Sequence, residues 1–188
     1  MAWKNTNSRY GTLAKAFHWL TFLLVVTLLI VGYLMDDFDG AIRPFMYTTH
    51  KLFGLLLLLL MALRIIWALA NPKPKLPKGT SYLEKFAEHF VHGAMYLLLF
   101  IMPLAGWFMS TAAGKAPTFY GLFSIPMPFV PLNKAWAKIA FSIHEISAIL
   151  IIIFVCIHVA AALYHHYVRE DNILIRMLPG DDHRNFDA

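Results

Sequence analysis

The chain has 188 residues and a formal net charge of +5, and 59% of its residues are hydrophobic while only 14% are charged. Soluble domains carry about 25% charged residues, so the composition excludes an ordinary soluble domain and favours a single membrane-embedded domain over residues 1–188. The basic residues lie between apolar runs rather than on one surface, which argues against nucleic-acid binding. The single cysteine, Cys156, excludes a disulfide framework or a thiolate metal cluster within one chain.

Four apolar runs predict membrane-spanning helices at about residues 14–35, 47–70, 83–112 and 136–168. A helix of about 20 residues crosses the hydrocarbon layer, and every run reaches that length. The proline-rich stretch 71–79 cannot be helical, because each proline removes a backbone donor and restricts the residue before it. The expected fold class is therefore all-α, an integral membrane four-helix bundle with short tails at both ends.

The distribution of lysine and arginine predicts the orientation of these helices. One side of the membrane receives Lys4, Arg9, Lys15, Arg64, Lys73, Lys75, Lys78, Lys85, Arg169, Arg176 and Arg184, and the other receives Arg43, Lys51, Lys115, Lys134 and Lys138. Basic residues accumulate on the cytoplasmic side of membrane proteins. Both termini and the proline-rich loop are thus expected in the cytoplasm.

Histidines inside the predicted helices are candidates for function, because ionisable residues within a membrane are costly. The informative ones are His18, His50, His92, His144 and His158. His144 and His158 share one helix, 14 residues apart. At about 1.5 Å per residue this is roughly 21 Å and close to four turns, so both rings project from nearly one face at two depths.

The predicted topology pairs these histidines by depth. His18 opens a helix that enters from the cytoplasm, so it belongs with His158 at the inner level, while His50 belongs with His144 at the outer level. Two imidazoles that face each other from different helices suit six-coordinate haem iron, which transfers electrons rather than binding oxygen. A Cys-x-x-Cys-His sequence for covalent haem attachment does not occur. The bundle is therefore expected to enclose two b-type haems.

Neighbouring residues fit this expectation. Gly54 lies one turn after His50, where a missing side chain would let a porphyrin approach. Arg9, Arg64 and Lys51 lie near the membrane boundaries, where they could meet haem propionates.

Two further residues have more than one interpretation. His92 could replace His18 as the inner ligand, line a cavity, or hydrogen-bond a propionate. Glu145 could carry protons near the outer haem, or it could be a solvated glutamate at a helix end.

Several local sequences resemble the bacterial cytochrome b561 family. They are Phe17-His18-Trp19, His50 with Gly54, Ile143-His144-Glu145, Ile157-His158, and the tail Asp171-Asn172 with Leu174, Arg176-Met177 and Pro179. The similarity extends from about Ser8 to Pro179. This family comprises small di-haem membrane cytochromes and includes a superoxide:ubiquinone oxidoreductase. Its haem ligands, carried over by position, fall on His18, His50, His144 and His158.

The resemblance implies electron transfer in the bacterial inner membrane, from superoxide or a periplasmic redox partner to ubiquinone. Superoxide would be oxidised to oxygen and ubiquinone reduced. The outer basic residues Arg43, Lys51, Lys115, Lys134 and Lys138 would attract the superoxide anion.

Three alternatives stay open. The protein could be an electron-transfer subunit that docks a periplasmic dehydrogenase or cytochrome, it could oxidise quinol and deliver electrons outward, or it could transport haem or a metal. Zinc-protease chemistry is excluded because His144-Glu145 is not followed by a histidine at the required spacing.

Overall fold

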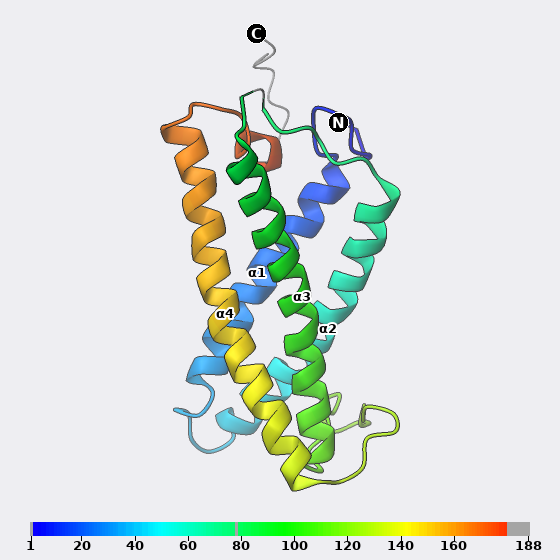
Figure 1. Cartoon of the computed structure of the whole chain (residues 1–188). Coiled ribbons are helices and arrows are strands. Elements are labelled where there is room, and N and C mark those ends of the chain that lie inside the picture. Colours follow the sequence, from blue (N-terminus) through cyan, green and yellow to red (C-terminus); the bar gives the residue numbers. More distant parts are fainter. Residues whose placement is uncertain (1, 78, 180–188) are drawn as a thin grey trace. The chain divides into compact units, whose positions relative to one another are not determined.

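The computed structural model describes residues 2–77 and 79–179, and within them the regular elements are helices, with one isolated β-bridge between Thr118 and Ser124. The elements are α1 (Thr12–Leu34), α2 (Ile42–Ala70), α3 (Tyr82–Ala112), α4 (Lys134–Tyr167) and the short 3-10 helix η1 (Ile175–Met177), as Figure 1 shows. The all-α fold class with four long apolar helices is confirmed. Two residues of the predicted cytoplasmic set, Lys78 and Arg184, lie outside the described residues.

Side-chain caps define two of the helix starts. Before α3, the Ser81 hydroxyl accepts from the backbone N–H of Glu84, and the Glu84 carboxylate accepts from the backbone N–H of Ser81 at 2.7 Å. This reciprocal capping box satisfies two donors that a helix start leaves unpaired. Before α4, the side-chain carbonyl of Asn133 accepts from the backbone N–H groups of Ala135 and Trp136. These polar starts separate the apolar helices from their loops.

Helix α2 begins at Ile42 rather than near residue 47. Pro44 lies in its first turn, where the missing N–H would have no helical partner in any case, so proline is tolerated there. The Arg43 guanidinium donates to the backbone carbonyls of Phe38, at 2.7 Å, and Asp36. These bonds close the loop between α1 and α2.

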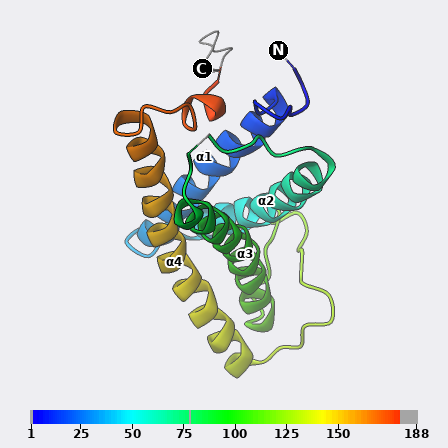
Figure 2. The ribbon, with the colours of Figure 1, turned by 45° about the horizontal axis from the view of Figure 1, so that its top comes forward.

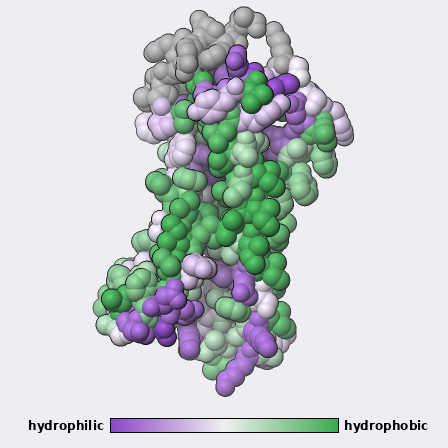
Figure 3. Space-filling model, turned by 90° about the vertical axis from the view of Figure 1, so that its left-hand side faces the viewer, coloured by the Kyte–Doolittle hydropathy of each residue, from purple (hydrophilic) through white to green (hydrophobic). Residues whose placement is uncertain are grey.

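The outer surfaces of the helices suit lipid rather than water. All four α helices are long and apolar enough to cross a membrane. Large apolar side chains on them are widely exposed, including Leu69 at 84% and Ile66 at 64%. Figure 3 shows one face on which hydrophobic residues gather over the helices and hydrophilic residues gather beyond them. The chain is a multi-pass membrane protein.

The chain divides into two compact units. The central unit comprises Thr21–Met61 and Tyr96–Ile151, and the terminal unit comprises Met1–Leu20, Ala62–Met95 and Ile152–Ala188. The most deeply buried apolar side chains, Leu57, Met61 and Ile151, belong to the central unit. In the terminal unit, polar contacts join the N-terminal residues to the proline-rich loop, such as the bond from the Asn5 amide to the carbonyl of Pro72.

Candidate functional sites

The central unit brings together His50 from α2 and His144 from α4. Their ring centroids lie 6.2 Å apart and their planes are inclined by 75°. A metal-bound imidazole nitrogen lies about 2 Å from the metal, with the ring centre about 1 Å behind it, so two rings on opposite sides of one iron have centroids roughly 6 Å apart. The spacing of this pair therefore fits one iron held between the two rings.

A backbone carbonyl orients the ring of His144. Its Nδ1 lies 2.7 Å from the carbonyl oxygen of Met102 on α3. A carbonyl only accepts, so Nδ1 carries the proton and Nε2 keeps its lone pair for a metal. Metal-binding histidines commonly donate their second N–H in this way, which fixes the ring and raises its basicity.

Glycines make room for both rings of this pair. A Cβ atom on Gly32 of α1 would lie 2.9 Å from Cε1 of His50, and one on Gly106 of α3 would lie 3.0 Å from Cε1 of His144. Sequence reasoning missed both positions as part of the site. The sequence does show a glycine within an apolar helix at each position, and such a glycine indicates that another group approaches the helix closely.

Space remains beside the central pair. His50, His144, Gly54, Gly106 and Trp107 line one cavity. A Cβ atom on Gly54 would meet nothing within 4 Å, so the helix surface beside this cavity is open. Nδ1 of His50 is buried without a hydrogen-bond partner, which is unusual for a buried polar atom. The residues present thus fit a bound haem.

The terminal unit brings together His18 from α1 and His158 from α4. Their ring centroids lie 6.1 Å apart with an interplanar angle of 52°, close to the spacing of the central pair. His92 of α3 lies nearer to His158, with centroids 5.0 Å apart and ring planes at 81°. That distance is shorter than two rings on opposite sides of one iron require, so the geometry favours His18 over His92 as the second ligand.

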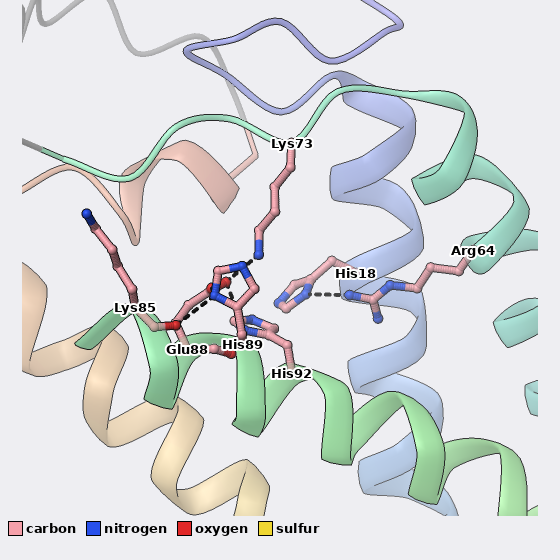
Figure 4. Close-up of polar contacts among 7 residues, drawn as sticks. All are labelled: His18, Arg64, Lys73, Lys85, Glu88, His89 and His92. Carbon is pink, nitrogen blue, oxygen red and sulfur yellow. Dashed lines mark hydrogen bonds and ion pairs between the residues drawn. The ribbon is translucent and has the colours of Figure 1, made fainter. Parts of the chain in front are cut away.

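Arg64 extends from α2 to the ring of His18 (Figure 4). Its Nη2 lies 3.3 Å from Nδ1 of His18. A guanidinium only donates, so Nδ1 accepts in this arrangement and the proton is on Nε2. Coordination through Nε2 would place the proton on Nδ1 and turn Arg64 to another acceptor, for which a haem propionate is chemically suited.

A polar cluster surrounds His92. Its Nδ1 lies 2.8 Å from the carbonyl oxygen of Glu88 and 3.2 Å from the Glu88 carboxylate. Lys73 of the proline-rich loop forms an ion pair with the same carboxylate at 2.5 Å (Figure 4). The Nδ1 of His92 is therefore oriented by a backbone carbonyl, as the Nδ1 of His144 is, so the 5.0 Å ring spacing to His158 is the observation that favours His18 as the ligand.

Buried polar atoms without a partner also occur in the terminal unit. They include Trp67 Nε1, Asn71 Oδ1, His166 Nδ1, Asn172 Oδ1 and Arg176 Nε. Buried polar atoms are normally paired. The observation that supports a haem in the terminal unit is the spacing of the His18 and His158 rings.

The predicted basic residues of the central unit fall into two groups. Lys51 lines the cavity of His50 and His144, and its ammonium donates to the carbonyl of Lys115 at 2.8 Å. Arg43 is bound to its own loop and lies 3.8 Å from the Asp39 carboxylate. Both side chains make internal contacts, so they are less available to attract an anion from solution.

Other predicted residues lie in exposed positions. Lys115, Lys134, Lys138 and Glu145 are exposed in the central unit. Arg9 is exposed in the terminal unit, where its backbone N–H donates to the Thr6 hydroxyl at 3.0 Å.

Paired imidazoles on apolar membrane helices define a membrane cytochrome. The family model for prokaryotic cytochrome b561 matches residues 9–180, and the chain belongs to that family. Cytochrome b561 homolog 2 of Escherichia coli (strain K12) is 32% identical over 95% of each chain. A Yersinia pestis protein named "Probable superoxide oxidase CybB" is 31% identical over 92% of this chain and 97% of its own length. Cytochrome b561 homolog 1 of Escherichia coli (strain K12) is 28% identical over 92% of this chain and 98% of its own.

Family membership establishes a bacterial membrane cytochrome that carries electrons by means of b-type haem. The prediction of the family from the histidine-containing sequences is thereby confirmed. The assignment of individual ligands remains a proposal, supported by the spacing of the two imidazole pairs.

Proposed function

We propose that the protein is a di-haem cytochrome that oxidises periplasmic superoxide and reduces ubiquinone in the bacterial inner membrane, with both termini in the cytoplasm. The observation that carries this proposal is the presence of two imidazole pairs, His50 with His144 and His18 with His158, whose ring centroids lie 6.2 and 6.1 Å apart. One pair belongs to each unit, so each unit could hold one haem. The name of the Yersinia pestis relative supports superoxide as the donor.

Haem, when bound, would supply one-electron chemistry. The residues of this chain would hold and orient that group. The Met102 carbonyl fixes the ring of His144, and Gly32 and Gly106 let the ligand rings approach neighbouring helices. Arg64 and Lys51 offer positive charge beside the ligand pairs, suited to propionates.

The reaction balances over one quinone molecule. Two superoxide anions lose one electron each and leave as oxygen, and ubiquinone takes up both electrons and two protons to form ubiquinol. The anion would be attracted by the exposed lysines of the central unit, Lys115, Lys134 and Lys138.

The internal hydrogen bonds of Lys51 and Arg43, the other two predicted basic residues, support a second function. Because Lys51 and Arg43 are bound to backbone carbonyls, only part of the expected cationic set is open to an anion. The same imidazole pairs would then serve an electron-transfer subunit that links a periplasmic redox partner to the quinone pool, in either direction.

Spectroscopy of the detergent-purified protein distinguishes these functions. Haem is counted per chain, and the dithionite-reduced spectrum is compared with spectra after superoxide and after a water-soluble ubiquinone. Superoxide dismutase, added before superoxide, provides the control for donor identity. We expect two low-spin b haems and quinone reduction that dismutase abolishes. Two haems without this activity would favour the docking subunit, and haem that is absent or readily lost would contradict both.

A further inference from the structure

The segment after α4 folds back within the terminal unit (Figure 2). The chain reverses at Glu170, whose backbone lies in the left-handed region with φ +54°. Oδ2 of Asp171 lies 2.5 Å from Nδ1 of His165, and its Oδ1 accepts from the backbone N–H of Ile173 at 3.0 Å. The Asp171 and His165 side chains are only 16% and 15% exposed. Both carboxylate oxygens of Asp171 therefore hold the reversal against the end of α4.

The other end of this segment contacts two more parts of the terminal unit. Nη1 of Arg176 donates to the backbone carbonyl of Lys75 at 2.6 Å. The carbonyl of Met177 accepts from the indole N–H of Trp19 at 2.9 Å. Trp19 in turn lies edge-on to its neighbour His18, with ring centroids 5.4 Å apart. A series of contacts thus runs from the end of α4 to the ring of His18.

We propose that residues 171–177, here called the strap, position His18 for iron binding by holding the indole of Trp19. This proposal depends on the proposed haem function of the His18–His158 pair. Trp19, Asp171 and Arg176 act as positioning residues: Asp171 and Arg176 fix the two ends of the strap, and Trp19 transmits its position to the ligand. This assigns a role to the tail sequence that contributes to the family resemblance.

The physical reason lies in the tolerance of a ligand site. Ligands must be held within about 0.5 Å and roughly 10–20° of their productive geometry, which requires neighbours whose own positions are fixed. A part-buried indole needs a partner for its N–H, and here that partner is a carbonyl of the strap. Loss of this hydrogen bond would remove one restraint on the indole, whose edge faces the ring of His18.

The central unit offers a matched control for the test. Trp107 donates its indole N–H to the carbonyl of Ile125 at 2.8 Å and lines the cavity of the central pair. Trp19→Phe and Trp107→Phe therefore each remove one indole N–H that bonds a carbonyl, but in different units. Asp171→Asn tests the strap at its far end, without touching His18 or Trp19. His18→Ala and His50→Ala supply reference spectra that assign each haem signal to its unit.

The measurements are electron paramagnetic resonance of the two low-spin haems and the rate of haem transfer to an acceptor apoprotein. Trp19→Phe and Asp171→Asn should shift the g values of the terminal haem and speed its loss roughly three- to tenfold, as expected for one lost hydrogen bond. Trp107→Phe should leave the terminal signal unchanged.

Three outcomes decide between the proposals. A terminal haem that behaves as in the parent in both Trp19→Phe and Asp171→Asn would overturn the strap. A parent without haem between His18 and His158 would overturn the strap and the di-haem assignment together. A parent protein with two haems that does not reduce quinone would overturn the proposed substrate alone. The g values of Trp19→Phe and Asp171→Asn would then still decide whether the strap positions His18.

Discussion

The imidazole Nδ1 of His144 and the backbone carbonyl of Met102 are joined across 2.7 Å, so a proposed ligand on α4 takes its orientation from α3. Met102 directly precedes Pro103 within an unbroken helix. Because this orienting group is a backbone atom, no side-chain substitution at Met102 removes it directly. The ligand side chains are therefore the most direct place to test the site.

Replacement of His144 by alanine should remove about half of the haem and leave the low-spin signal of the other pair. The reason is that His50 and His144 belong to one unit, whereas His18 and His158 belong to the other. Pyridine haemochrome quantification, with visible spectra of the reduced protein, measures the result. Retention of the full haem content in His144→Ala would contradict the assignment of this pair.

Substitution at Gly32 should disturb the central haem more than substitution at an open glycine. Gly32→Ala would place a methyl group 2.9 Å from the ring of His50, whereas a Cβ on Gly93 of α3 would meet nothing within 4 Å. Overpacking of this kind typically costs about 1–3 kcal/mol. The thermal midpoint of haem loss, followed at the Soret band, should fall in Gly32→Ala. Equal midpoints for Gly32→Ala and Gly93→Ala would show that the ring of His50 does not need this approach.

His92 and His18 should respond differently to removal. His92→Ala should keep both low-spin haems, because its ring lies 5.0 Å from that of His158, too near for the opposite side of one iron. His18→Ala should lose the terminal haem or convert it to a high-spin form. Resonance Raman spin-state markers would separate these results. A high-spin terminal haem in His92→Ala, with His18→Ala unchanged, would reverse the ligand assignment.

Neutralisation of the exposed lysines should slow the consumption of superoxide. In a Lys115→Gln, Lys134→Gln and Lys138→Gln variant, the rate should fall by a few-fold to roughly tenfold at low salt, and its dependence on ionic strength should weaken. Pulse radiolysis at several salt concentrations measures both. Arg9→Gln, which removes one exposed positive charge from the terminal unit, is the control for charge loss outside the central unit. Unchanged rates in the triple variant would support the docking subunit instead.

Much of the fold could be predicted from sequence because length and apolarity alone decide whether a helix can cross a membrane. The four helices and the family were predicted correctly. The rings of the histidines paired by depth lie 6.1 and 6.2 Å apart, but the structure also brings the ring of His92 to within 5.0 Å of that of His158, and the ligand assignment stays a prediction. The beginning of α2 at Ile42 was missed because a proline in the first turn looks the same in sequence as a proline in a loop.

The supporting contacts could not be predicted, because they depend on the rotation of each helix about its axis. Each residue adds about 100° of rotation around the axis of a helix. A shift of one residue therefore decides whether Gly106 faces His144 or lipid. The bond from Trp19 to the carbonyl of Met177 joins residues 158 positions apart and involves a backbone atom. Residue type in the sequence gives no sign of either contact.

The division of the chain between the two units has a consequence for biosynthesis. The central unit is complete once Ile151 has been made. The terminal unit also needs Ile152 and the residues after it. Chains are synthesised from the N-terminus, and early parts can fold before later ones exist. His50 and His144 are therefore available to one haem before His158 leaves the ribosome. If both pairs bind haem, synthesis in this order predicts that the central pair receives its haem first and that residues from Ile152 onward complete the second site.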